Sequence, residues 1–255
     1  MLGWVASRLK VLLPWMGLAL SGCLPPSSSS QSVTAEPKTC EHVPSDQRGS
    51  FMAQVQGFPL VISADADFTL DQRQSLVRAV EQWNEIGQEV LKQDLFRLNF
   101  AVPPSFLKQL HPADCQVNFG GRRDFYIFRE TDTEHWLTMG LNKLIPGATF
   151  RCEQSGQALR QIIYIYPELV DATQFSSIIL HELGHTIGLN HSCSSLLKGR
   201  ADFRSCYNLT INHPYRQAVM YPWLHNSSHK SELVEVKDFL QENDQVRAAC
   251  ELRAL

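Results

Sequence analysis

The sequence lacks a strong net charge, a paired-cysteine motif and an uninterrupted membrane-spanning run. Its 23 Lys and Arg residues nearly balance 26 Asp and Glu residues, so no basic surface for nucleic acid is expected. None of the seven cysteines belongs to a CxxC pair, which argues against a cysteine zinc knuckle and a thioredoxin-like redox site. With 255 residues, 44% of them hydrophobic, the chain can bury one substantial core.

The first 22 residues are typical of an export signal. Arg8 and Lys10 precede the apolar run VLLPWMGLAL. This run is short and is interrupted by Pro14, so we do not expect it to span a bilayer stably. We therefore predict a signal peptide over residues 1–22.

The residues at the end of this leader indicate a lipid anchor. The segment Leu20–Cys23, LSGC, resembles the lipobox of bacterial lipoproteins, in which the cysteine is lipidated and becomes the new N-terminus. An ordinary secretory signal that happens to contain a cysteine is the alternative. Leu24 stands where an Asp retains such proteins in the inner membrane, so in a Gram-negative host the resemblance implies an exported, lipid-anchored protein at the outer membrane.

Residues 23–39 are predicted to form a flexible, lipid-anchored tether. They are rich in Ser and Pro and contain almost nothing to bury. The sixteen residues that follow Cys23, residues 24–39, reach about 22 Å on average, enough to hold a folded domain just off a membrane. We expect that domain to occupy residues 40–255.

Hydrophobic patterning predicts an α+β fold with a twisted, mixed, five-stranded sheet. A long amphipathic helix is expected over 69–93, with Thr69 as its N-cap and Leu76, Val77, Val80 and Trp83 on one apolar stripe. The strand candidates are Phe58–Asp65, Phe96–Val102, Asp124–Glu130, Ala148–Cys152 and Gln161–Pro167.

A second helix is predicted from Asp171 to just before Gly188. Asp171 is a plausible N-cap, and Gln174 three residues later completes a pattern like a capping box. Gly188 can adopt the left-handed conformation that ends a helix and turns the chain back. The face toward the sheet is expected to carry Phe175, Ile179, Leu183 and Ile187.

The end of this helix carries the segment HELGHTIGLNH, which predicts a zinc site. From the composition, a chance occurrence of this spacing is on the order of 10⁻⁵ per chain. His181 and His185 lie one helical turn apart and can bind one Zn²⁺ from the same side, while Gly188 allows His191 to return as a third ligand. Three ligands leave one position open for a water that acts as a nucleophile, and Glu182 is placed to be its general base.

These residues resemble the extended zinc motif of the metzincin metalloproteases. The segment VMYP, Val219–Pro222, resembles the Met-turn of that clan, which implies that Met220 lies beneath the zinc as an apolar floor. Gly184, Ser192 and the triplet Met220-Tyr221-Pro222 are most similar to those of matrixins. The resemblance implies a metzincin-like fold whose sheet, long helix and active-site helix are followed by a small C-terminal subdomain with a terminal helix. It also implies a monomeric zinc endopeptidase that uses one zinc ion and acts on a protein or peptide.

Two alternatives remain at the level of the sequence. A structural zinc site would use the same ligand types, but a fourth protein ligand would close it and Glu182 would have no role. A non-catalytic surface lipoprotein could use the same fold for binding. The other histidines are expected on the surface or hydrogen-bonded within loops; they are His42, His111, His135, His213, His225 and His229. Of these, His225 and His229 could approach the cleft, because they follow the predicted Met-turn closely.

The number of cysteines predicts three disulfides and an oxidising compartment. Lipid at Cys23 leaves an even number of cysteines. Cys193 and Cys206 both lie in the 28-residue connection between His191 and Met220, where a bridge would restrain a polar loop. The predicted pairs are Cys193–Cys206, Cys115–Cys152 and Cys40–Cys250.

Overall fold

The fold is described from a computed structural model of the chain. The structure describes residues 57–102, 124–142, 145–154, 157–193, 205–210, 212–222 and 238–254, all within one compact unit, Lys38–Leu255. The predicted signal peptide, Cys23 and the tether lie outside these residues. Within the described ranges, no helix combines the length and hydrophobicity needed to cross a membrane.

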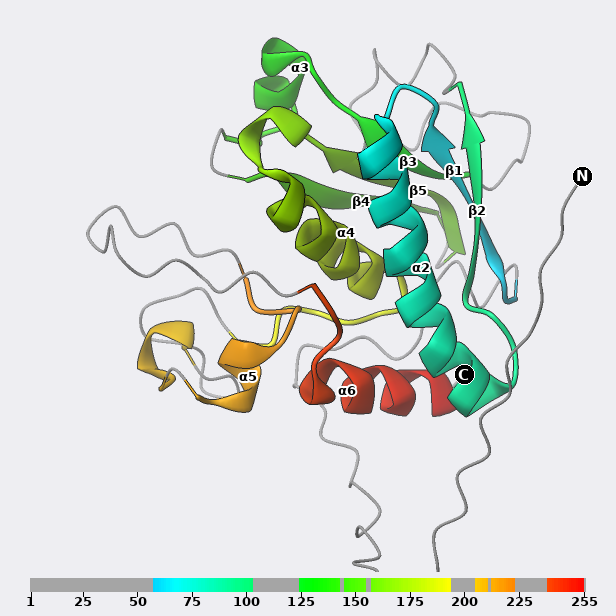
Figure 1. The fold of residues 1–255 in the computed structure, drawn as a ribbon, viewed down its shortest axis with the longest axis vertical. Helices are drawn as coiled ribbons and strands as arrows, with labels where there is room; N and C mark the ends of the chain where they lie inside the picture. The colour runs from blue at the N-terminus through cyan, green and yellow to red at the C-terminus, as the bar shows by residue number, and fades with distance from the viewer. Residues whose placement is uncertain are drawn as a thin grey trace, which may run out of the picture. The chain divides into compact units, whose positions relative to one another are not determined.

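A single mixed sheet of five strands forms the centre of the fold (Figure 1). The strand order is β2-β1-β3-β5-β4. The first four strands in that order pair in parallel, whereas β4 runs antiparallel to β5 and lies at the edge of the sheet. All five strands overlap the predicted segments: β1 (Leu60–Asp65), β2 (Phe96–Ala101), β3 (Asp124–Arg129), β4 (Gly147–Gln154) and β5 (Gln157–Ile165).

Helix α2 (Leu70–Leu91) is the long amphipathic helix that the sequence predicts. Thr69 caps its N-terminus, because Thr69 Oγ1 accepts a hydrogen bond from Gln72 N and Gln72 Oε1 accepts one from Thr69 N. The buried stripe includes the fully buried Trp83. The prediction that Val77 belongs to this stripe is wrong, since Val77 is 39% exposed. Neighbouring helical residues are rotated by about 100°, which turns Val77 away from the face that Leu76 buries.

Helix α4 (Ala172–Thr186) packs against α2 on one face of the sheet (Figure 1). Its N-terminus has the predicted cap: Asp171 Oδ1 accepts a hydrogen bond from Gln174 N at 2.8 Å, and Gln174 Oε1 accepts one from Asp171 N at 3.2 Å. Gly188 follows the helix with a φ of 99°. The predicted apolar face is buried, namely Phe175, Ile179, Leu183 and Ile187.

The two faces of β5 contribute to different apolar clusters. Ile163 and Ile165 pack in the cluster that includes α2 and α4, whereas Ile162 and Tyr164 pack in the cluster that includes Trp136 of α3 (Thr133–Thr138). This follows from the alternation of side chains along a strand. Both faces of the sheet are therefore covered near the edge where β4 lies.

After α4 the chain forms short elements and then the terminal helix. The single turn η3 (Cys206–Asn208) and the short helix α5 (Pro214–Gln217) follow α4, whereas the single turn η2 (Pro167–Leu169) lies before it, between β5 and α4. The predicted terminal helix is α6 (Glu242–Arg253), which contacts α2 and α5. In Figure 1 it crosses the end of α2 at a steep angle.

Candidate metal centre

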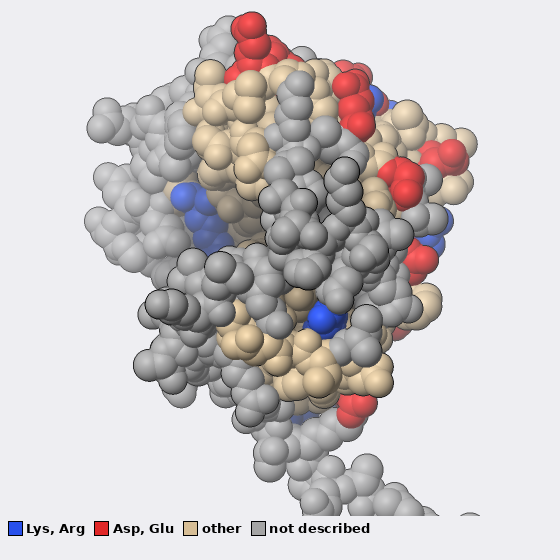
Figure 2. Space-filling view, turned by 90° about the vertical axis from the view of Figure 1, so that its left-hand side faces the viewer, with Lys and Arg blue, Asp and Glu red and all other residues tan. Residues whose placement is uncertain are grey.

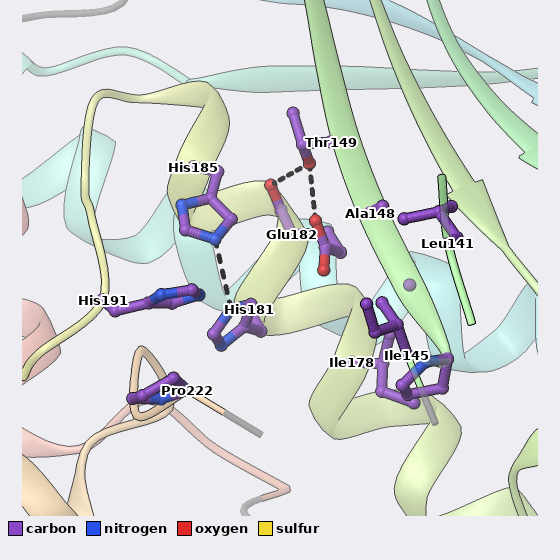
Figure 3. A pocket seen from close by; sticks show the side chains of 12 residues that line it. Leu141, Ile145, Ala148, Thr149, Ile178, His181, Glu182, His185, His191 and Pro222 are labelled. Carbon is purple, nitrogen blue, oxygen red and sulfur yellow. Dashed lines mark hydrogen bonds between the residues drawn. The ribbon is translucent and has the colours of Figure 1, made fainter. Parts of the chain in front are cut away.

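Helix α4 and the turn that follows it bring three histidines together (Figure 3). His181 and His185 lie one turn apart, and the left-handed Gly188 returns the chain so that His191 faces them. The ring centroids are 4.8 Å apart for His181 and His185, and 5.1 Å apart for each pair that includes His191. One nitrogen from each ring lies within 4.8 Å of the others. The structure thus brings together all three predicted ligands.

Backbone carbonyls determine which nitrogens of the first two rings can bind a metal. His181 Nδ1 donates to Val219 O at 2.8 Å, and His185 Nδ1 donates to Leu189 O at 2.7 Å. In a neutral imidazole the second nitrogen then has a lone pair and no proton. The two Nε2 atoms are 3.1 Å apart, so two lone pairs face each other.

A cation between these two nitrogens would remove their repulsion. Two nitrogens bonded to one tetrahedral zinc at 2.0–2.1 Å lie about 3.3–3.4 Å apart, close to the separation seen here. Metal-binding histidines also commonly donate their other N–H to a backbone carbonyl, as His181 and His185 do. The residues present therefore fit a zinc ion.

Burial keeps the three histidines neutral. It lowers the pKa of His181 to about 4 and that of His191 to about 3, and it lowers the pKa of His185 well below its usual value. Unfavourable interactions with neighbouring positive groups add to each shift, among them Arg247 beside His181. Because zinc binds neutral imidazole, these side chains need not lose a proton at neutral pH before binding.

The metal-binding group has three members among the residues that the structure describes. No fourth His, Cys, Asp or Glu side chain of those residues joins it. A structural zinc site is closed by four protein ligands, whereas a catalytic site keeps a position for water or substrate. The described part of the chain thus matches the open type.

The Glu182 carboxylate lies in the same cavity as the histidines and is not a member of their group. The side chain is 5% exposed, and its Oε2 accepts a 2.7 Å hydrogen bond from the Thr149 hydroxyl of β4. Burial raises the pKa of Glu182 to about 7, while the hydrogen bond from Thr149 acts in the opposite direction. This position suits a group that accepts and returns protons near neutral pH.

A cavity of about 350 Å³ opens at the candidate centre. Its polar part consists of the three histidines, Glu182 and Thr149, and β4 contributes the edge of the sheet (Figure 3). The remainder is lined by Gly147 and by apolar residues, namely Leu141, Ile145, Pro146, Ala148, Ile178 and Pro222. An apolar side chain could therefore be buried directly beside the histidines.

Met220 packs beneath α4, the helix that carries His181 and His185. Its side chain is fully buried, and a Cβ added to Gly184 would lie 2.3 Å from Met220 Sδ. Gly184 is thus required for the close approach of the two segments. The carbonyl of the preceding residue, Val219, accepts the hydrogen bond from His181, so this turn both supports the helix and orients a ligand.

Two buried charged residues of α6, Asp244 and Arg247, form hydrogen bonds with the backbone near Met220 and next to His191. The Asp244 carboxylate accepts hydrogen bonds from Val219 N at 2.7 Å and Met220 N at 3.1 Å. Arg247 donates to Asn190 O, directly before the third histidine. Burial raises the pKa of Asp244 above its usual value. The hydrogen bonds from backbone amides and the nearby Arg247 act in the opposite direction. The terminal helix therefore anchors both the Met220 turn and the His191 turn.

The predicted disulfide between Cys193 and Cys206 is present, with the two Cα atoms 5.2 Å apart. It joins the chain two residues after His191 to the start of η3. Cys152 and Cys250 are also disulfide-bonded. Their predicted partners, Cys115 and Cys40, lie outside the described residues, so those two pairings stay predictions.

The other described histidines have local roles. His135 Nδ1 pairs with the Glu130 carboxylate, and His213 caps α5 by accepting a hydrogen bond from Tyr215 N. Neither belongs to the metal-binding group. Four more lie outside the described residues: His42, His111, His225 and His229.

Three residues of the site have no counterpart among the predictions. Thr149, Asp244 and Arg247 reach it from β4 and α6, far from the histidine motif in sequence. The spacing of Gln241 and Asp244 is that of a capping box, a signal for a helix start. That signal does not reveal that the same carboxylate also binds the Met220 turn.

Comparisons with family models and with curated proteins give no match. Among the solved structures that are similar is one of myroilysin, at 12% sequence identity and a TM-score of 0.34. The match covers 75% of this chain and 92% of that chain. The function of this protein is therefore inferred from the geometry of its site.

Proposed function

We propose that this protein is a zinc-dependent endopeptidase of the metzincin type, most similar to matrixins. The observation that carries the proposal is the juxtaposition of three neutral histidine ligands and the Glu182 carboxylate in one open cavity. A zinc ion bound there supplies a Lewis acid with an open position, able to acidify a water and polarise a carbonyl. The protein side chains supply the remaining functions.

Glu182 is the general base of the proposed reaction. Its carboxylate accepts a proton from the water that attacks the scissile carbonyl, and it returns that proton to the amine that leaves. His181, His185 and His191 hold the ion. Met220 supports the helix that presents two of these ligands.

The substrate is proposed to be an extended peptide that lies along β4. This strand is at the edge of the sheet, beside the cavity, and an extended peptide can add to such an edge through backbone hydrogen bonds. The apolar part of the cavity would then take one substrate side chain. We expect a preference for large apolar residues next to the scissile bond. On the face shown in Figure 2, most of the described Asp and Glu side chains lie along the upper and right-hand margin.

The experiment that tests the function is hydrolysis of a peptide library by the full chain purified in detergent. Mass spectrometry of the products locates the cleavage sites. We expect internal cleavages beside large apolar residues, loss of cleavage with a zinc chelator, and its return when zinc is added. Cleavage that continues undiminished in the chelator would contradict the proposal.

The competing proposal is a non-catalytic surface lipoprotein that uses this fold for binding. Glu182 favours the enzyme, because a binding protein has no need of a buried carboxylate beside the ligand histidines. The substitution of Glu182 argued in the Discussion separates the two.

We also propose that the protein is exported and acts as a monomer held by lipid on Cys23 at the outer membrane, on its periplasmic or cell-surface side. Support comes from the leader and from LSGC at its end. The substitution Cys23→Ser is expected to move the protein from the membrane fraction to the soluble exported fraction. An unchanged distribution on fractionation would overturn the lipid anchor.

A further inference from the structure

Alternate residues of the edge strand β4 meet successive turns of the active-site helix. A Cβ on Gly147 would lie 2.6 Å from Ile178 Cγ2. The Thr149 hydroxyl is bonded to Glu182, and the Arg151 guanidinium donates to His185 O. Strand residues two apart lie on the same face. Contacts on both sides of Thr149 thus fix the register in which its side chain faces Glu182.

The Thr149 hydroxyl donates a hydrogen bond to one of the two oxygens of the Glu182 carboxylate. Thr149 Oγ1 donates to Oε2 at 2.7 Å, and the backbone carbonyl of Glu182 is a longer second acceptor for the same hydroxyl at 3.3 Å. Within the described part of the chain, no other side chain donates to this carboxylate. Figure 3 shows the second oxygen directed away from Thr149.

Gly147 leaves room for that second oxygen. A Cβ at this position would lie 3.2 Å from Glu182 Oε1, tighter than an ordinary van der Waals contact. The strand therefore binds one carboxylate oxygen through Thr149 and leaves space around the other at Gly147. The two oxygens of Glu182 are made different by their surroundings.

We propose that Thr149 is a positioning residue that holds Glu182 Oε2 so that Oε1 is the oxygen that exchanges protons with water and leaving amine. This inference rests on the proposed function of Glu182 as general base. A free carboxylate can rotate about its last torsion, which is broad and roughly two-fold. The hydrogen bond from Thr149 removes this freedom before the substrate binds. It should therefore raise kcat and leave KM nearly unchanged.

Two substitutions of Thr149 separate positioning from packing. Thr149→Val removes the hydroxyl and keeps the branched shape, whereas Thr149→Ser keeps the hydroxyl and removes the methyl group. We expect kcat for peptide hydrolysis to fall about tenfold in T149V, with KM unchanged within about twofold, the scale of losing a hydrogen bond to a charged group. T149S should retain most of kcat, and both variants should bind one zinc per chain.

A spectroscopic measurement gives a readout that does not require activity. In protein with ¹³C-labelled glutamate carboxyls, the Glu182 resonance is identified by its absence from E182Q. We expect this resonance to move in metal-free T149V and to stay near its wild-type position in T149S. Thr149→Ala is the second variant without a hydroxyl, for use if T149V does not fold.

The outcomes distinguish this inference from the proposed function. Loss of kcat in T149V with rescue in T149S supports positioning by the hydroxyl. Equal losses in T149V and T149S, a loss expressed in KM alone, or an unchanged kcat and Glu182 resonance in T149V would overturn it. In each of those cases a wild-type chain that cleaves peptides and an inactive E182Q would leave the proposed function intact. If wild type cleaves no peptide, the proposed function fails and this inference fails with it.

Discussion

Replacing Glu182 by Gln is expected to lower kcat for peptide hydrolysis by at least about 10²-fold while one zinc stays bound. Gln keeps the size and shape of the side chain and can still accept the hydrogen bond from Thr149, but its amide cannot take a proton from water at neutral pH. The histidines are untouched, so zinc affinity should change little. Steady-state kinetics and metal analysis of the same preparation measure both effects.

The matched control for this substitution is Glu85→Gln. Glu85 is exposed on α2, so the same chemical change there should leave both kcat and zinc content unaltered. An E182Q chain that retains zinc and turns over at the wild-type rate would refute the assignment of Glu182 as general base. If neither wild type nor E182Q cleaves peptides, the result favours the non-catalytic alternative.

Replacing Asp244 by Asn is expected to destabilise the protein by about 3 kcal/mol and to weaken zinc binding about tenfold. The Asp244 carboxylate accepts hydrogen bonds from Val219 N and Met220 N inside the protein. An Asn side chain has one acceptor oxygen, so at least one buried amide loses its partner, and the buried Arg247 loses a compensating charge. Breaking a buried charged interaction in this way costs about 3–5 kcal/mol, and mutations in the support of metal ligands typically cost 10–100-fold in affinity.

The measurements for Asp244 are denaturant unfolding of the metal-free chain and zinc affinity by competition with a chelator. Asp238→Asn is the control, because Asp238 is exposed just before α6 and the charge change is identical. If D244N binds zinc as tightly as D238N does, the Met220 turn does not depend on α6 for the geometry of the centre.

The ligand set could be predicted because its determinants lie within eleven residues. A helix fixes the spacing of His181 and His185, and Gly188 is the residue type that allows the turn toward His191. The same local rules predict the caps at Thr69 and Asp171. These features depend on short-range geometry, which the order of residues determines directly.

The support of the site could not be predicted, because it depends on how distant elements pack. Thr149 reaches Glu182 only when β4 lies in one register against α4, and a shift of one residue would turn its side chain to the other face. Asp244 has the spacing of an ordinary helix cap, and only the folded chain brings the Met220 turn to it. Val77 lies about 100° around the helix from Leu76, and a stripe that wide is buried only where another element covers both positions.

The central claim is that one zinc ion on His181, His185 and His191 is required for peptide hydrolysis. The most direct test is to strip the full chain with a chelator, remove the chelator, and follow cleavage of one library peptide while zinc is titrated back. We expect the rate to rise linearly and to break at one zinc per chain, with no such rise in a chain carrying His191→Ala at the same zinc concentrations. A rate that is independent of added zinc, or the same titration curve in H191A, would contradict the claim.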